Sequence, residues 1–144
     1  MPNRPISSII ENQRIVTAGE KTTVSEAAKL MKQGKVGAIM VVKGGRLIGV
    51  FTERDALFRV LAEGRDAQTT RLAAVMTPDP QTIRPDRPFG HALHMMYEGG
   101  FRHVPVVENG KPIGMVSSRD AMGPELNEFV TELESREHIK EILG

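Results

Sequence analysis

The sequence predicts an α/β (α+β) fold in which two copies of one helix–hairpin–helix unit pack together about a pseudo-twofold axis, followed by a C-terminal helix. The main observation is an internal repeat. Residues 31–57 align with residues 96–122 at an offset of 65 without a gap, and ten of the 27 positions are identical. Chance at average residue frequencies gives about two identities. The second observation is that each copy changes from helical apolar spacing to short apolar runs joined by a turn pair.

The repeat divides the chain of 144 residues. We expect a first repeat over residues 6–62, a polar linker over residues 63–70, a second repeat over residues 71–125 and a C-terminal helix over residues 126–144. A unit of about 60 residues buries so little apolar surface that it is only marginally stable alone. The two copies should therefore pack through their sheets, with a cleft between them that equivalent residues of both copies line.

The first helix of each copy is predicted from apolar residues spaced i, i+3, i+4 and i+7. This spacing starts at Val24 in one copy and at Phe89 in the other. Thr23 and Glu26 have the spacing of a capping box at the start of the first helix, and Gly34 suits its end.

Apolar runs predict a hairpin in each copy. The strands are expected over residues 38–42 and 46–51, and again over residues 103–107 and 111–116. Gly-Gly and Asn-Gly pairs between them suit tight turns. The runs are nearly continuous rather than alternating, so both faces of each hairpin should be covered. A second helix is expected over residues 56–63.

Composition excludes several classes of protein. The chain has 19 Lys and Arg against 18 Asp and Glu, a net charge of +1, so a strong nucleic-acid binder is disfavoured. It contains no cysteine, which excludes disulfides, thiolate nucleophiles and Cys-based zinc sites. The longest apolar run, residues 38–42, is far short of a membrane span, and the N-terminus lacks a secretory signal core. We expect an intracellular, cytoplasmic protein without membrane association.

A short motif follows the second strand of each copy, where a glycine is succeeded by a hydroxyl residue and then by an aspartate. The two motifs consist of Gly49, Thr52 and Asp55 and of Gly114, Ser117 and Asp120. By spacing alone the hydroxyl and the acid form a capping box that needs no ligand. A strand glycine, however, often marks the close approach of a ligand or another backbone. A helix N-terminus attracts phosphate, and a carboxylate can accept from vicinal ribose hydroxyls, so the motif also suits a nucleotide.

The duplicated unit with this motif resembles the CBS domain, and two units in tandem resemble a Bateman module, a sensor of adenosine ligands. The resemblance covers residues 6–125. It implies that Asp55 and Asp120 hold ribose hydroxyls, that Thr52 and Ser117 contact phosphate, and that each adenine lies against the other copy. For the Asp120 site it names Val16, Val36, Gly37, Ala38 and Met115. For the Asp55 site it names Val50, Gln81, Thr82 and Phe101.

The two copies differ in basic residues. Arg102 and His103 stand where the first copy has Gly37 and Ala38. The resemblance implies that basic residues at these positions contact phosphate. Alternatively, Arg102 is simply exposed to solvent and His103 is packed in the protein without a ligand. We expect one site to dominate, with Asp120→Ala losing most of the ligand's stabilising effect. Two more arginines precede the acidic residues, Arg54 and Arg119. They are either phosphate partners or solvated charges.

These features predict a regulatory module, not an enzyme, that binds AMP, ADP, ATP, S-adenosylmethionine or NAD between its repeats. It would signal by assembly or through a protein partner, and the resemblance implies a homodimer. An interaction adaptor for protein or nucleic acid is the alternative. A small phosphohydrolase is less favoured, because the chain has no nucleophilic cysteine and no phosphate-binding loop with lysine. No catalytic cofactor and no metal are expected. His91 and His94 have metal-compatible spacing but lack an evident third ligand.

The C-terminal segment carries two apolar stripes. The first comprises Leu126, Phe129, Val130 and Leu133, and the second Ile139, Ile142 and Leu143. The segment either packs back on the body or meets a partner chain, and the sequence favours neither alternative.

Overall fold

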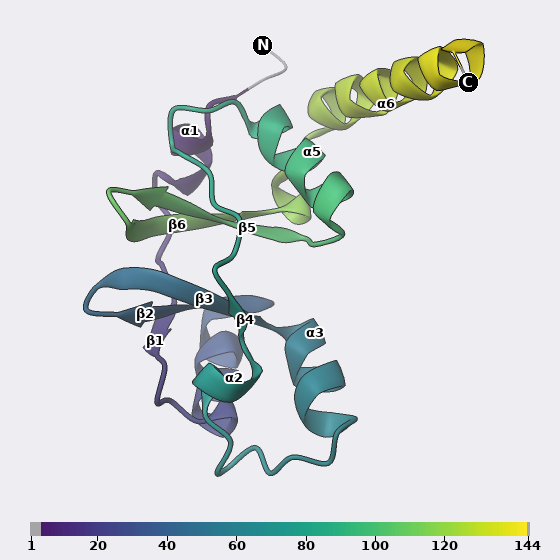
Figure 1. The fold of residues 1–144 in the computed structure, drawn as a ribbon. Helices are drawn as coiled ribbons and strands as arrows, with labels where there is room; N and C mark the ends of the chain where they lie inside the picture. The colour runs from purple at the N-terminus through teal and green to yellow at the C-terminus, as the bar shows by residue number, and fades with distance from the viewer. Residues whose placement is uncertain (1–3, 144) are drawn as a thin grey trace.

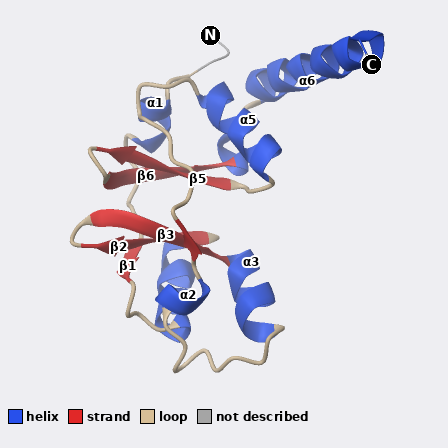
Figure 2. Cartoon of the chain, viewed as in Figure 1, coloured by secondary structure: helices blue, strands red, loops and turns tan. Residues whose placement is uncertain are grey.

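Two sheets lie side by side in the middle of the molecule, and helices cover the outer side of each (Figure 1, Figure 2). The structure is a computed structural model that describes residues 4–143, except for the side chains of Pro124 and of residues 138–143. One sheet has the strand order β1-β2-β3-β4 and the other pairs β5 with β6. The predicted α/β fold of two packed repeats and a C-terminal helix is confirmed.

The elements of the two repeats follow the predicted order. Repeat 1 contains β1 (Thr17–Gly19), α2 (Val24–Gly34), β2 (Ala38–Lys43), β3 (Arg46–Thr52) and α3 (Glu53–Asp55), which continues as π-helical turns (Ala56–Leu61). Repeat 2 contains α5 (Phe89–Gly99), β5 (His103–Glu108), β6 (Lys111–Ser117) and a 3₁₀ turn (Ser118–Asp120). Helix α1 (Ile6–Ile10) precedes the elements of repeat 1, and α4 (Leu72–Val75) and β4 (Thr77–Pro78) lie between those of repeat 1 and repeat 2. Helix α6 (Gly123–Leu143) follows repeat 2.

Both hairpins close through turns in which the two central residues have positive φ. The angles are 58° and 77° at Gly44 and Gly45, and 54° and 80° at Asn109 and Gly110. A two-residue turn of this handedness matches the twist of the flanking strands, and Gly and Asn tolerate it best. The sequence prediction of tight turns is therefore confirmed in both repeats.

Both ends of α2 lie where the sequence predicts them, but the residue with a left-handed backbone is not the glycine. At the start, the Thr23 hydroxyl accepts a hydrogen bond from the Glu26 N–H at 3.2 Å, as predicted. At the other end Gly34 is the last helical residue, as predicted, and Lys35 after it takes the left-handed conformation with φ 54°. Gly100 occupies the equivalent position after α5, with φ 72°. Repeat 1 thus places a side chain where repeat 2 has glycine.

Each repeat is completed by the segment that precedes the other repeat. Helix α1 lies against β6, and the Ile6 N–H donates to the Arg87 carbonyl at 2.8 Å. Conversely, α4 joins repeat 1, where the Leu72 N–H donates to the Thr22 carbonyl at 2.9 Å. The chain therefore crosses between the repeats twice. This exchange is absent from the sequence prediction, which drew each repeat as one continuous segment.

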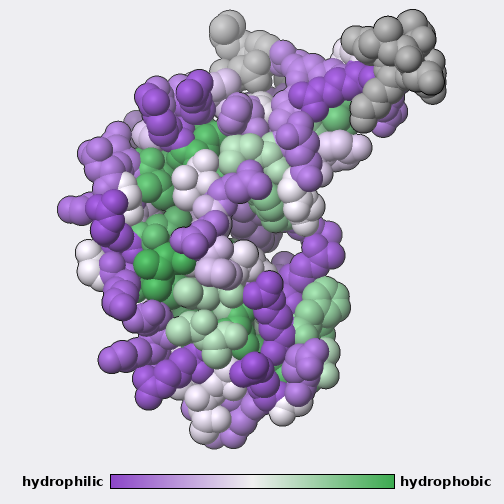
Figure 3. All heavy atoms as spheres, viewed as in Figure 1, coloured by the Kyte–Doolittle hydropathy of each residue, from purple (hydrophilic) through white to green (hydrophobic). Residues whose placement is uncertain are grey.

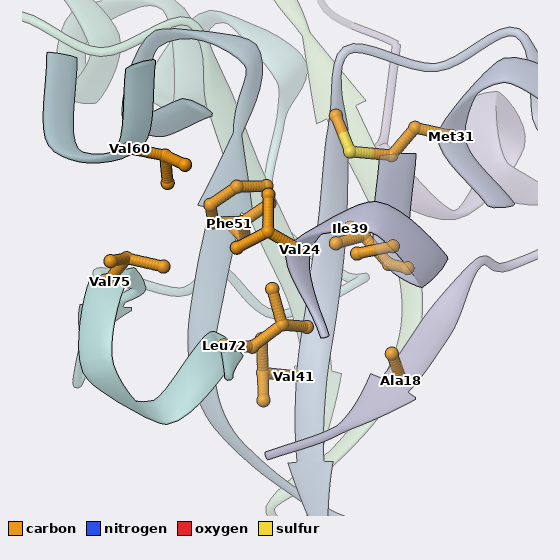
Figure 4. Close-up of a cluster of buried hydrophobic side chains, with 10 residues drawn as sticks. Ala18, Val24, Met31, Ile39, Val41, Phe51, Val60, Leu72 and Val75 are labelled. Carbon is orange, nitrogen blue, oxygen red and sulfur yellow. The ribbon is translucent and has the colours of Figure 1, made fainter. Parts of the chain in front are cut away.

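Two hydrophobic cores result, one under each sheet. In the first, Leu72 from α4 lies among Val24, Val41 and Phe51 (Figure 4). In the second, Ile6 from α1 is fully buried with residues of α5, β5 and β6. Complete burial of an Ile or Leu side chain contributes about 1.5–3 kcal/mol. The exchanged helices are thus held by burial as well as by their backbone hydrogen bonds.

The repeats diverge after their acidic motifs. In repeat 1 the chain continues from α3 into helical turns, whereas in repeat 2 Ala121 is extended and α6 then leaves the body of the molecule (Figure 1). The first half of α6 packs on α5 through Phe129, whose ring centroid lies 4.9 Å from that of His94 and 6.0 Å from that of Tyr97.

Of the two alternatives for the C-terminal segment, packing on the body therefore holds for the first half of α6. Leu126 and Val130 of the predicted first stripe are nevertheless 44% and 48% exposed. The second stripe, Ile139, Ile142 and Leu143, lies outside the described side chains.

Candidate functional site

The first acidic motif forms a capping box at the start of α3. The Thr52 hydroxyl accepts from the Asp55 N–H, and the Asp55 carboxylate accepts from the Thr52 N–H, both at 3.1 Å. The arrangement satisfies two N–H groups that a helix start leaves without partners. This is the structural role that spacing alone predicts.

Asp55 has further partners within the protein and is only 7% exposed. Its Oδ1 lies 3.5 Å from Nε of Arg59, one helical turn later. The Thr77 hydroxyl lies 3.5 Å from both carboxylate oxygens. The spacing of Asp55 and Arg59 could have indicated the ion pair, whereas nothing local pointed to Thr77. A ribose bound to Asp55 would therefore have to compete with Arg59 and Thr77 for the carboxylate oxygens.

The second motif has the same bond but a different setting. The Ser117 N–H donates to Oδ2 of Asp120 at 2.7 Å, and Asp120 is only half-buried. Within the described residues, the Asp120 carboxylate has no ion pair or side-chain hydrogen bond like those of Asp55 with Arg59 and Thr77. Its interactions with Arg4 and His103 are longer-range electrostatic effects. Asp120 therefore keeps more acceptor capacity than Asp55.

The motif glycines make room for protein rather than for a ligand. A Cβ added at Gly49 would lie 2.4 Å from Sδ of Met76, and one at Gly114 would lie 2.7 Å from Cγ2 of Ile10. Met76 and Ile10 belong to the two exchanged segments. Of the two explanations for the glycines, approach of another chain segment is therefore correct, and they give no support for a nucleotide.

Two clefts lie between the repeats, each next to one acidic motif. The first has a volume of about 490 Å³ and the second about 350 Å³. Both fall at the lower end of the range for small-molecule sites, roughly 300–1,000 Å³. Each combines the motif of one repeat with the loop and first strand of the other, as the pseudo-twofold arrangement predicts.

Most of the residues predicted to surround Asp55 line the first cleft. They are Val50, Thr52, Asp55, Gln81 and Phe101, and the basic pair Arg102 and His103, which the sequence did not assign to either site, lines it as well. Thr82 is not among them. The cleft also contains residues that the sequence did not single out for it, Glu53, Arg59, Thr77, Asp79, Pro80, Gly99 and Gly100, together with Arg54. Three arginines thus face three carboxylates within it.

The second cleft contains the residues predicted around Asp120 with one exception. They are Val36, Gly37, Ala38, Met115, Ser117, Arg119 and Asp120. Val16 is not among them, because it packs against the core of repeat 1. The residues missed by the sequence prediction are Gln13, Lys35 and His103. The Gln13 amide both donates to the Met115 carbonyl and accepts from the Met115 N–H, each at 2.7 Å, and so closes the edge of β6.

The positions of Arg102 and His103 bear on the expectation that one site dominates. Arg102 lines the cleft of Asp55, not that of Asp120, while His103 borders both clefts. A dominant Asp120 site therefore cannot be argued from this pair. Such dominance has to rest on the greater exposure of the Asp120 carboxylate instead.

His103 is partly buried between charged groups. Burial lowers the pKa of His103 below its ordinary value of 6.5, and the carboxylates of Glu53 and Asp120 oppose that shift. Arg102 and Arg119 add to the lowering through like-charge repulsion. An anion bound in either cleft would act in the same direction as the carboxylates.

The described part of the chain has neither a metal-binding cluster nor a membrane-spanning helix. Among the described side chains, those of residues 4–137 except Pro124, no group of three or more His, Asp or Glu is arranged to hold a metal ion. His94 instead contacts Glu132 of α6, and His91 is exposed. Over the same described range, no helix combines the length and the apolar character that crossing a membrane requires.

Comparison with known proteins identifies the family. A model of the CBS domain matches residues 6–62 and 72–123. The chain belongs to the CBS domain family. The two matched ranges correspond to the two repeats, so the protein carries a CBS tandem, a regulatory module.

Relatives of similar and of greater length share this tandem. The CBS domain-containing protein YhcV of Bacillus subtilis is 36% identical over 107 residues, which cover 74% of this chain and 76% of YhcV. The mitochondrial CBS domain-containing protein CBSX3 of Arabidopsis thaliana is 36% identical over 117 residues, covering 78% of this chain but only 57% of CBSX3. The chain therefore spans little more than half of that relative.

A solved structure shows the same fold with a ligand. The CBS domain protein PAE2072 of Pyrobaculum aerophilum, complexed with AMP, is similar to this chain with a TM-score of 0.79 and 26% identity. The match covers 89% of this chain and 99% of PAE2072.

Proposed function

We propose that this CBS tandem is a regulatory module that binds an adenine nucleotide or a related adenosyl compound in the clefts between its repeats. The carrying observation is the second cleft, where the available Asp120 carboxylate of one repeat faces Val36, Gly37 and Ala38 of the other. A carboxylate that accepts from ribose hydroxyls and an apolar wall for a base are the two features that adenosine requires. The AMP complex of the similar PAE2072 supports the same ligand class.

The two clefts differ in what they offer a nucleotide. The Asp120 cleft offers the freer carboxylate together with Lys35 and Arg119. The Asp55 cleft is larger and contains Arg102, which can form charge-assisted bonds to phosphate, but its carboxylate already has Arg59 and Thr77 close by. We therefore infer that the Asp120 cleft binds first.

The test is a thermal-shift panel followed by isothermal titration calorimetry. The panel contains AMP, ADP, ATP, NAD and S-adenosylmethionine, with GTP as the non-adenine control. A ligand at 100 times its Kd adds about 2.7 kcal/mol of stability. We expect at least one adenosine compound to raise the Tm and to bind by calorimetry. Absence of binding by all of them at millimolar concentration would overturn the proposal.

Signalling by such a module requires a change in assembly or in a partner. The helical segment that follows Asp55 has three exposed apolar side chains, Leu57, Phe58 and Leu61. Figure 3 shows apolar surface in pale green on the side of the molecule where this segment lies. Met122 and Leu126 are at the positions that the 65-residue offset relates to Leu57 and Leu61, and they are 55% and 44% exposed. A second copy could present matching surfaces about a twofold axis, so we propose a homodimer through these helices.

The dimer is tested by sedimentation velocity on the full chain. Leu61 is 73% exposed, so Leu61→Glu should leave the monomer folded while it places a charge in the contact. We expect a dimer in the wild type and a monomer in the variant. Leu30→Glu on α2, also exposed and apolar, serves as the matched control and should remain dimeric. A wild type that is still monomeric at about 0.1 mM would have a dimer Kd well above that value and would contradict the proposal.

A further inference from the structure

One ion pair joins the second cleft to the C-terminal helix. Arg4 donates from Nε to Oε2 of Glu125 at 3.0 Å and from Nη2 to Oε1 of Glu125 at 2.7 Å. The same Nη2 donates to the main-chain carbonyl of Asp120 at 2.7 Å. Oε1 of Glu125 also accepts from the Met122 N–H at 3.0 Å. We call this set of residues, Arg4, Asp120, Met122 and Glu125, the Arg4 clasp.

The clasp is buried on its acidic side. The Glu125 side chain is 3% exposed and that of Arg4 is 27% exposed. The hydrogen bonds from Arg4 lower the pKa of Glu125 and outweigh the opposing effect of burial. A bidentate pair between a guanidinium and a carboxylate has a fixed geometry, so it holds its partners in orientation as well as in distance.

Arg4 is itself held by repeat 2. Its carbonyl accepts from the Phe89 N–H at 2.8 Å, and its guanidinium lies 5.8 Å from the centroid of the Phe89 ring. The clasp therefore has its base at the start of α5 and connects it to two other segments. One is the backbone of the residue whose carboxylate lines the cleft, and the other is the first turn of α6.

The chain between these two segments is short and irregular. Only Ala121 and Met122 separate the 3₁₀ turn (Ser118–Asp120) from α6. A shift of the Asp120 backbone therefore has to be taken up by Arg4, by α6, or by both. Repeat 1 has no counterpart of this linkage, because there the chain continues helically from Asp55 to Leu61.

We propose that the Arg4 clasp couples ligand binding in the Asp120 cleft to the docking of α6, so that each stabilises the other. The proposal rests on the proposed function and adds to it the route by which binding would reach the rest of the molecule. Arg4 and Glu125 act as positioning residues, because neither lines the cleft. Coupling of this kind is reciprocal, so weakening the clasp must weaken ligand binding.

The experiment compares the full wild-type chain with Arg4→Gln, Arg4→Lys and Glu125→Gln. Titration calorimetry with AMP and ATP measures the Kd, and hydrogen exchange of the peptides over residues 125–137 measures the docking of α6 with and without ligand. Arg4→Lys keeps the charge but loses the fork, so it is the variant that preserves the fold if Arg4→Gln does not. Arg136→Gln is the matched control, because it removes an exposed ion pair between α6 and Glu98 of α5 without touching the clasp.

We expect the ligand to slow exchange in α6 of the wild type and of Arg136→Gln. In the three clasp variants this response should be lost, and the Kd should rise by at least about fivefold. A wild type that binds ligand, together with clasp variants whose Kd and exchange response are unchanged, would overturn the coupling alone. A wild type that binds no adenosine compound would overturn the proposed function and the coupling with it.

Discussion

Asp55 and Asp120 occupy the same position in the two repeats but have different surroundings. Asp55 is 7% exposed and lies beside Arg59 and Thr77. Asp120 is half-buried, and within the described residues its carboxylate accepts a hydrogen bond from the Ser117 N–H alone. The helix that follows explains part of this difference. The position equivalent to Arg59 in repeat 2 is Pro124, which has no charge to offer. The same motif is thus occupied by contacts within the protein in repeat 1 and keeps acceptor capacity in repeat 2.

The largest expected effect is on ligand binding by Asp120→Ala. Removing a carboxylate that accepts from two ribose hydroxyls should cost about 3 kcal/mol, or roughly a hundredfold in Kd. Asp55→Ala should raise the Kd for the same ligand less than tenfold. Calorimetry on both variants separates the clefts. A larger loss in Asp55→Ala would reverse the order of the two sites that we propose.

The second effect concerns stability and has the opposite order. Asp55→Ala removes a cap and leaves Arg59 without its buried partner, so the free energy of unfolding should fall by about 2 kcal/mol. Asp120→Ala should lose about 1 kcal/mol, because chiefly the bond to the Ser117 N–H disappears. Urea denaturation of both unliganded variants measures this difference. Equal losses would show that the extra contacts of Asp55 contribute nothing.

The ends of α2 and α5 provide a third comparison of the repeats. Lys35 is held at φ 54°, where a Cβ is unfavourable, so Lys35→Gly should raise the free energy of unfolding by about 1 kcal/mol. Gly100→Ala at the equivalent position should lower it by a similar amount. Thermal and urea denaturation of the two variants measure both changes. Unchanged stability in Lys35→Gly would mean that contacts of the lysine side chain offset its strain.

The sequence could predict those features that are local. The repeat, the two hairpin turns and the Thr52 cap each depend on residues within a few positions of one another. The two acidic motifs could be predicted for the same reason. Most of the residues that line the clefts could also be predicted, because the repeat implies that the two copies face each other.

Long-range features could not be predicted in this way. Ile10 fills the space beside Gly114, Gln13 binds Met115, and Arg4 reaches Glu125, over more than one hundred residues in each case. These contacts arise because the N-terminal segment with α1 packs on repeat 2, and no spacing of residues in the sequence indicates that arrangement. The same limitation placed Val16 in a cleft although it packs in a core.

The smallest expected effect tests the residue that the two clefts share. Burial lowers the pKa of His103, so the unfolded chain binds this proton more readily than the folded chain. The contribution of His103 to stability is therefore present above its ordinary pKa of 6.5 and is lost as the pH falls towards its lowered value. The groups that face it are Glu53, Arg102, Arg119 and Asp120.

Urea denaturation at about pH 7.5 and about pH 5.5 measures this loss around the histidine pKa. We expect the free energy of unfolding to fall less between these pH values in His103→Gln than in the wild type. His91→Gln is the matched control, because His91 is exposed and should leave the wild-type decline unchanged. An equal decline in all three proteins would show that His103 titrates alike in the folded and unfolded chains. Burial would then not disfavour the protonated form of His103, and a bound anion would have no such effect to offset.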